Sequence, residues 1–258
     1  MSATAAALRE LHHSRKPGDP LVLPGPWDAA SAKVFADAGF PALATPSAGV
    51  AAGLGYEDGQ TPADEMFAAI TRIVRAVDIP VTADVEAGYG LGAQELVARL
   101  LETGAVGCNL EDTDHATGAL RDPQEQADWL AQVRAAAGDA LVINARIDTY
   151  LRPVRGEGGT AREDETIRRG LLYAEAGADC VYPFAAPPPL LGELAAAIGL
   201  PLNAVALPDG PTPRELGALG ATRITFGPGF QWRAMAAVRE MAEGLRAEMA
   251  GGERRDRT

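Results

Sequence analysis

Four short stretches of this chain, each closing a predicted strand, contain most of the side chains that could do chemistry. These stretches span residues 54–59, 82–90, 109–112 and 144–148. Four of their carboxylates and their one arginine are the candidates for chemistry: Asp58, Asp84, Glu86, Glu111 and Arg146. Carboxylates that share a site repel one another, so a group of them needs a positive partner. The pattern therefore predicts a divalent-metal site that receives an anionic substrate beside an arginine.

The spacing of the acidic residues suggests how they would share a cation. Asp84 and Glu86 are two residues apart at the end of a predicted strand, which can place both side chains on one face. Gly88 and Gly90 follow and allow a sharp backbone turn. A hard cation such as Mg²⁺ keeps several waters, so we expect Asp84 to make the closest contact and Asp58, Glu86 and Glu111 to hold its waters.

There are two alternatives to a Mg²⁺ site, one without a metal and one with zinc. In the first, the carboxylates cap helices or pair with surface arginines. Zinc is disfavoured, because no His/Cys set has the spacing of zinc ligands.

Arg146 stands where its planar guanidinium could grip a substrate carboxylate or phosphonate. The alternative is a structural ion pair with Asp148 or Glu111. Ser47, Ala48 and Gly49 follow a predicted strand and could present backbone N–H groups to the same anion.

His115 lies four residues after Glu111, and the other histidines are the adjacent pair His12 and His13. Its loop has a hinge-like glycine, so His115 could be the proton donor of a mobile lid, or an ordinary exposed loop histidine. The two lysines, Lys16 and Lys33, lie outside the predicted strands. A Schiff-base aldolase is therefore excluded, because it needs a lysine in its pocket.

Apolar strand-like runs alternate with helical patterns along the chain. The predicted strands are 21–24, 42–45, 81–83, 107–110, 141–145, 180–183, 202–205 and 223–226. The predicted helices are 28–38, 62–77, 92–103, 124–137, 161–176, 187–198, 213–219 and 230–248. Eight such units predict an α/β fold of the (β/α)₈ TIM-barrel type, in which the carboxyl ends of the strands carry the active site. An open doubly wound sheet is disfavoured, because no Gly-x-Gly-x-x-Gly turn follows the first strand.

Bulk composition fits one domain over residues 1–258, with a frayed tail at 251–258. The chain is 47% hydrophobic and carries a formal net charge of −12, which argues against nucleic-acid and anionic-membrane partners. No apolar run is long enough to span a bilayer, and the N-terminus has no secretory-signal pattern. Cys108 and Cys180 fall in predicted strands and read as buried apolar residues. A cytoplasmic protein is expected.

Taken together, these motifs resemble the isocitrate lyase/phosphoenolpyruvate mutase superfamily over roughly residues 20–245. The similar segments are 54–58, 84–90, 111–112 and 145–148, which occur in the family's order. The resemblance implies a barrel whose last helix is exchanged between subunits, in a homodimer or homotetramer. It implies Mg²⁺ or Mn²⁺ bound largely through water, and cleavage of a C–C or P–C bond through a pyruvate enolate. It assigns Asp58, Asp84, Glu86 and Glu111 to the metal site and Arg146 to the substrate.

Departures from the family pattern indicate a divergent member. The loop after the fourth strand lacks the Lys-x-Cys-Gly-His of isocitrate and methylisocitrate lyases, and residues 113–121 lack the lysine and asparagine of phosphonomutases. Glu86 replaces an aspartate, and Phe184 replaces a glutamate of the family.

We therefore expect a Mg²⁺-dependent lyase or decarboxylase that acts on a small 2-oxo or 2-hydroxy carboxylate through an enolate. Arg146, His115 and Asp58 are the candidate catalytic residues, with His115 or a metal-bound water protonating the enolate. The alternatives are P–C bond chemistry and a barrel that binds a metabolite without turnover. The final helix, rich in Ala, Met and Leu over 234–248, could pack on a partner or on its own barrel.

Overall fold

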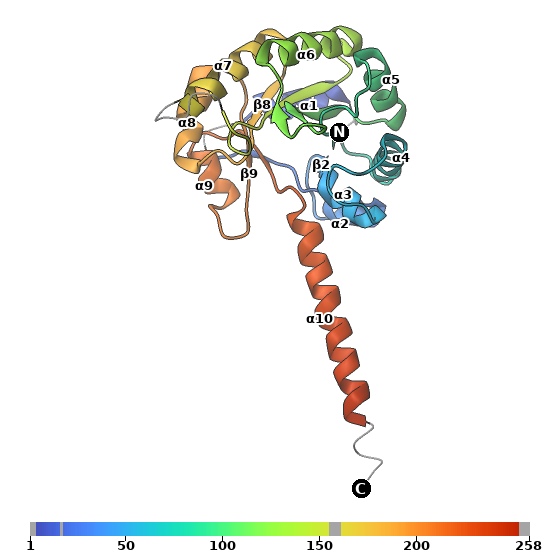
Figure 1. Cartoon of the computed structure of the whole chain (residues 1–258). Helices are drawn as coiled ribbons and strands as arrows, with labels where there is room; N and C mark the ends of the chain where they lie inside the picture. Colours follow the sequence, from blue (N-terminus) through green and yellow to red (C-terminus); the bar gives the residue numbers. More distant parts are fainter. Residues whose placement is uncertain (1–3, 16–17, 155–160, 253–258) are drawn as a thin grey trace.

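Eight parallel strands surround a central axis in the computed structural model, which describes residues 4–15, 18–154 and 161–252 (Figure 1). The strands are β1 (Leu21–Val22), β2 (Leu43–Thr45), β3 (Val81–Asp84), β4 (Gly107–Glu111), β7 (Val142–Ile147), β8 (Cys180–Pro183), β9 (Asn203–Val205) and β10 (Arg223–Thr225). Of the tail predicted at 251–258, the first two residues end the last helix, and 253–258 lie outside the described residues.

The strands close into a barrel through two seams. One sheet has the order β2-β3-β4-β7-β8 and the other has the order β1-β10-β9. A parallel bridge between Val181 and Leu202 joins β8 to β9. On the opposite side, the Ala44 N–H donates to the Pro24 carbonyl at 3.1 Å. The predicted (β/α)₈ architecture is confirmed, and all charged candidates at the strand ends face one mouth.

Helices surround the barrel between successive strands. The described outer helices are α2 (Ala29–Asp37), α4 (Ala63–Val74), α5 (Ala93–Thr103), α6 (Pro123–Ala137), α7 (Ala161–Glu175), α8 (Leu191–Ile198) and α9 (Pro213–Ala218). Their ends follow local chemistry: the Asp122 side chain caps α6 ahead of Pro123. Gly104 ends α5 in the left-handed region at φ 82°.

Several elements lie outside the predicted alternation. Helix α1 (Ala5–His13) shares a buried cluster with residues at the amino ends of β1 and β7, so it covers the floor of the barrel. A 3₁₀ turn, η1 (Pro188–Leu190), precedes α8.

Two of the added elements carry predicted site residues. Helix α3 (Ser47–Leu54) follows β2 directly, so the stretch 54–59 follows a short helix rather than closing a strand. Strands β5 (Thr113–Asp114) and β6 (Ala119–Leu120) form an antiparallel hairpin around His115.

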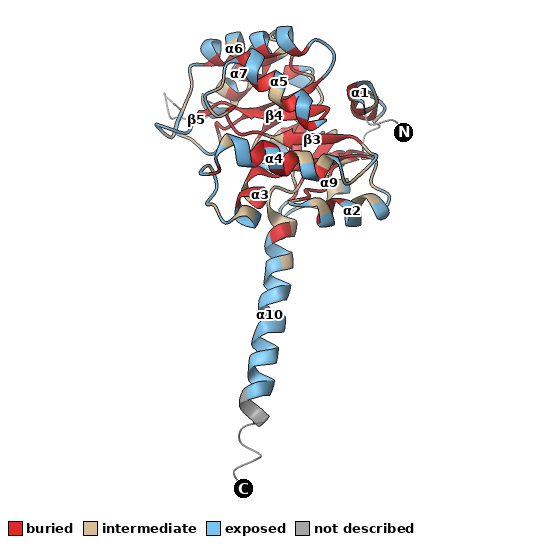
Figure 2. Cartoon of the chain, turned by 90° about the vertical axis from the view of Figure 1, so that its right-hand side faces the viewer, coloured by how far each residue is buried: buried red, intermediate tan, exposed pale blue. Residues whose placement is uncertain are grey.

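The last helix, α10 (Gly229–Gly252), leaves the barrel and extends away from it (Figure 1). Nearly all of its length is exposed, and only its base is buried (Figure 2). Across the part of the chain that the structure describes, no helix combines the length and apolar character needed to cross a membrane. Cys108 and Cys180 are buried and free, as predicted.

Candidate active site

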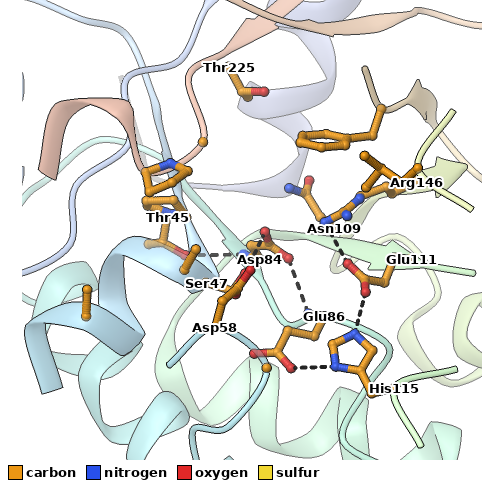
Figure 3. Close-up of a pocket in the computed structure, with 18 of the residues that line it drawn as sticks. Thr45, Ser47, Asp58, Asp84, Glu86, Asn109, Glu111, His115, Arg146 and Thr225 are labelled. Atoms are coloured by element: carbon orange, nitrogen blue, oxygen red, sulfur yellow. Dashed lines mark hydrogen bonds and ion pairs between the residues drawn. The ribbon is translucent and has the colours of Figure 1, made fainter. Parts of the chain in front are cut away.

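A cavity of about 710 Å³ opens at the carboxyl ends of the strands. Its walls include the charged residues predicted from the sequence, which arrive from β3, β4, β7 and the loops that follow α3 and β5 (Figure 3). The volume is within the range of small-molecule sites, about 300–1,000 Å³. The fold therefore brings residues from distant parts of the sequence to one hollow.

Asp84 ends β3 and receives few hydrogen bonds. Its Oδ2 accepts from the Ser47 hydroxyl at 3.1 Å, and its Oδ1 accepts from the Glu86 N–H at 3.2 Å. Burial raises the pKa of Asp84 to about 6, although the charge of Arg146 lowers it. A carboxylate in this position gains from a nearby cation.

Glu86 is held in an unusual backbone conformation in the turn after β3. Its φ is 54°, in the left-handed region, and Gly88 and Gly90 also have positive φ, so the predicted sharp turn is present. The residue is 4% exposed, and its Oε1 makes no hydrogen bond. Burial and the charge of Glu86 raise the pKa of the nearby Tyr89 hydroxyl. Burial and the charge of Asp84 raise the pKa of Glu86 to about 7.

His115 lies between two carboxylates. Its Nε2 pairs with Glu111 Oε1, and its Nδ1 is 3.4 Å from Glu86 Oε2 (Figure 3). The hydrogen bond to Glu111 raises the pKa of His115 above its ordinary value, although burial opposes this. Its side chain is 34% exposed, so His115 is positioned by two carboxylates and is still reached by solvent.

Glu111, at the end of β4, pairs with two positively charged side chains. Besides His115, it forms an ion pair with Arg146, whose Nη1 is 2.6 Å from Glu111 Oε2. Burial raises the pKa of Glu111, but the His115 hydrogen bond and the Arg146 charge outweigh it and lower the pKa below its usual range. Glu111 therefore stays ionised at neutral pH.

Arg146 enters the cavity from β7 and is fixed on three sides. Its Nε donates to Asp148 Oδ1 at 2.7 Å, and its Nη2 donates to Asp148 Oδ2 at 3.2 Å. Its guanidinium lies 4.3 Å from the centre of the Phe184 ring. Both ion pairs considered from the sequence are present, and they orient the guanidinium toward the cavity without using all five of its N–H groups.

The remaining predicted residues are placed unequally. Asp58 is exposed but lines the cavity, and its charge contributes to the raised pKa of Glu86. Ser47 and Ala48 line the cavity at the start of α3, which has no side-chain cap. Gly49 is not among the lining residues: a Cβ added there would meet Pro46 at 2.9 Å.

Within the described residues, no three His, Cys, Asp or Glu side chains converge closely enough to ligate a metal directly. Asp84 and Glu86 nevertheless supply carboxylate oxygens to one cavity, and Glu86 Oε1 is buried without a donor. These groups fit a hard cation that takes few direct carboxylates and keeps its water.

Other cavity residues were not predicted. Asn109 lies two residues before Glu111 on β4, so strand alternation could have identified it. Its Oδ1 accepts from Asn144 and from the buried Arg223, at 2.8 and 3.1 Å. Thr45, Tyr182 and Thr225 also line the cavity and lie at or near the carboxyl ends of β2, β8 and β10, whereas Arg152 and Trp232 carry no sequence signal that we can name.

Comparison with known proteins gives a consistent family. The family model described as phosphoenolpyruvate phosphomutase matches residues 8–246. An uncharacterized protein of Mycobacterium tuberculosis is 33% identical over 86% of this chain and 81% of its own length. The 2,3-dimethylmalate lyase of Eubacterium barkeri is 33% identical over 69% of this chain and 62% of its own.

A solved structure agrees with these relatives. A Burkholderia cenocepacia J2315 protein, described as a proposed phosphonomutase, superposes with a TM-score of 0.86 at 40% identity. The match covers 93% of this chain and 97% of that one. The resemblance inferred from the motifs is therefore confirmed by whole-chain similarity.

Proposed function

Because this chain belongs to the phosphoenolpyruvate phosphomutase family, within the isocitrate lyase/phosphoenolpyruvate mutase superfamily, we propose that it is a Mg²⁺- or Mn²⁺-dependent carbon–carbon lyase or decarboxylase. Its substrate would be a small 2-oxo or 2-hydroxy carboxylate, cleaved through an enolate. The observation that carries the proposal is the convergence of Asp84, Glu86, Glu111 and Arg146 on one cavity.

Asp84 and Glu86 would hold the cation, with Glu111 and Asp58 hydrogen-bonded to its waters. When bound, the divalent ion supplies a Lewis acid that stabilises negative charge on the enolate oxygen. The raised pKa values of Asp84 and Glu86 support this assignment, because the charges of Arg146 and His115 offset the burial of these carboxylates only in part.

Arg146 would bind the carboxylate of the 2-oxo acid end. Glu111, Asp148 and Phe184 keep its guanidinium in place before the substrate arrives, which limits the loss of conformational entropy on binding. The free backbone N–H groups at the start of α3, at Ser47 and Ala48, would add donors to the same anion. A phosphonate would be held by the same groups.

His115 would hold the proton for the enolate. The hydrogen bond to Glu111 raises the pKa of His115, and its Nδ1 faces Oε2 of Glu86. A proton on His115 can be delivered to the enolate carbon after bond cleavage. Asp58, on the exposed loop after α3, would help to enclose the substrate.

The test follows pyruvate release from oxaloacetate and substituted malates, with purified protein and Mg²⁺. We expect turnover with at least one of them, and a loss of at least one hundredfold in Asp84→Asn. Turnover of none, or equal rates in the variant, would overturn the proposal. Melting shifts without product would favour a metabolite-binding barrel.

A second candidate is P–C bond chemistry. The name of the matching family model and the 40% identity to a proposed phosphonomutase favour it. The hairpin sequence argues against it, because residues 113–121 contain neither lysine nor asparagine. Phosphorus NMR with phosphonopyruvate distinguishes the two, since only P–C bond cleavage converts a phosphonate signal into a phosphate signal.

For assembly, we propose a homodimer or homotetramer in which α10 packs on a second copy. Met235, Val238, Met241 and Leu245 recur every three or four residues along α10 and are 43–66% exposed. A projecting apolar stripe of this kind marks an interaction surface. No nucleic-acid or membrane partner is proposed.

A further inference from the structure

Two arginines line the cavity, and they differ in how far the protein satisfies them. Arg146 is ion-paired with Glu111 and Asp148. The Arg152 side chain forms no hydrogen bond or ion pair with any described residue, and its Nε is buried without a partner. An unpaired buried donor is destabilising, and more so when it belongs to a charged group. The site therefore contains a guanidinium that lacks an acceptor.

The backbone fixes where this guanidinium lies. The Arg152 N–H donates to the Asp148 carbonyl at 2.9 Å in the turn after β7, six residues beyond Arg146. Its Nη1 is 4.0 Å from the Cβ position that a side chain at Gly118 would occupy. Gly118 lies between β5 and β6, and both residues line the cavity. Arg152 is thus at the edge between the β7 loop and the hairpin.

The charge of Arg152 acts inside the site. It is among the charges that lower the pKa of Glu111, although Glu111 is not its ion-pair partner. Two carboxylates of the cavity pair with other cations: Glu111 with His115 and Arg146, and Glu86 with His115. No described carboxylate forms an ion pair with Arg152, so its guanidinium is available to a ligand.

The cavity has room for such a ligand. At about 710 Å³ it is much larger than a three-carbon oxo acid requires. Leu151 and Phe184 also line it and provide apolar contacts beside the two arginines. A longer acid could therefore hold one end at Arg146 and reach Arg152 with the other.

We propose that Arg152 is a specificity-determining residue, which binds a second carboxylate at the end of the substrate remote from its 2-oxo or 2-hydroxy acid group. This inference rests on the proposed function and narrows its substrate class to dicarboxylates. A planar guanidinium suits this role, because it can pair with a carboxylate through two parallel N–H bonds.

The test uses matched probes and calorimetric binding with saturating Mg²⁺. Malate and 2-hydroxybutyrate have the same chain length and differ in whether the far end is a carboxylate or a methyl group. Oxalate reports on the acid end alone. We expect the wild-type protein to bind malate at least tenfold more tightly than 2-hydroxybutyrate.

Arg152→Gln should reduce malate affinity at least tenfold while leaving oxalate and 2-hydroxybutyrate binding unchanged. Arg152→Lys should restore part of the loss, and Arg168→Gln, at an arginine 58% exposed on α7, should change nothing. Intact oxalate binding with no selective loss of malate overturns the role of Arg152 alone. Absence of oxalate binding in the wild type overturns the proposed function, and this inference with it.

Discussion

Asp179 and Asp84 lie at opposite ends of the barrel and have different partners. At the amino end, Asp179 accepts from Arg9 Nε at 2.8 Å, from Arg134 and from the Ile143 N–H at 2.7 Å. At the carboxyl end, Asp84 accepts one hydroxyl and one backbone N–H. The first aspartate is neutralised by the fold itself, whereas the second retains an unbalanced charge.

This difference separates a structural carboxylate from one available to a ligand. The pair of arginines at Asp179 connects α1 and α6 to the start of β8, which stabilises the floor of the barrel. Asp84 is close to Glu86 and Glu111, and its desolvation is only partly offset by Arg146. Active-site residues commonly lower the stability of the fold in this way, because function requires groups that the protein does not fully pair.

The largest effect is expected from removing the charge at the carboxyl end. Asp84→Asn should lower kcat/KM by at least 10²–10³-fold, because the substitution removes the closest carboxylate of the proposed metal site. Steady-state turnover and Mg²⁺ calorimetry would measure it. Asp64→Asn, at an aspartate whose side chain is 88% exposed, is the control. Retention of both Mg²⁺ binding and turnover in Asp84→Asn would contradict the assignment.

The next effect concerns stability at the amino end. Asp179→Asn should lower the free energy of unfolding by about 2–3 kcal/mol, less than the roughly 3–5 kcal/mol of a fully buried pair, because these groups are partly exposed. Urea unfolding would measure the change, and oxalate affinity with Mg²⁺ should be unaltered. A loss of oxalate binding without a loss of stability would show that the two ends are not separate.

A smaller effect should appear in the pH dependence of stability. Asp84 and Glu86 have folded pKa values above their ordinary ones, so their ionisation opposes folding progressively above their unfolded pKa values of about 4. The loss should be complete above about pH 7, and Asp84→Asn should recover about 1–2 kcal/mol at pH 8.

Mg²⁺ should counteract this loss of stability. We expect about 10 mM Mg²⁺ to raise the Tm more at pH 8 than at pH 5.5, because protons compete with the cation for the carboxylates. Thermal scans at both pH values provide the measurement. An equal shift at the two pH values, or one that persists in Asp84→Asn, would exclude these carboxylates as the cause.

A substitution in α10 should have the smallest effect on the stability and chemistry of the barrel, because this helix projects away from it. Met241→Glu should weaken subunit association, because it places a charge in the exposed apolar stripe of this helix. Analytical ultracentrifugation would show a shift toward monomer, with little change in far-UV circular dichroism. Glu243→Gln, at an exposed position of the same helix, serves as the control. If Met241→Glu has the same molecular mass in solution as the wild type, α10 is not part of the subunit interface.

Much of the site could be predicted because barrel topology is strict. Parallel strands place their carboxyl ends together, so Asp84, Glu111 and Arg146 had to face one mouth once eight strand–helix units were recognised. The role of His115 could not be chosen from its position in the loop. Its two carboxylate partners depend on the hairpin between β5 and β6, whose strands have only two residues each.

The amino-acid sequence by itself determined the alternation of strands and helices, the strand ends that carry the acids, and the family, because each follows from local residue types and their spacing. Only the tertiary structure decided which charges are neutralised. The same aspartate side chain is satisfied at position 179 and exposed to its like-charged neighbours at position 84. The unpaired Arg152 and the projecting α10 also depend on it. The pairing of Asp179 with Arg9 and Arg134 is set by distances between residues far apart in the chain, which no local pattern encodes.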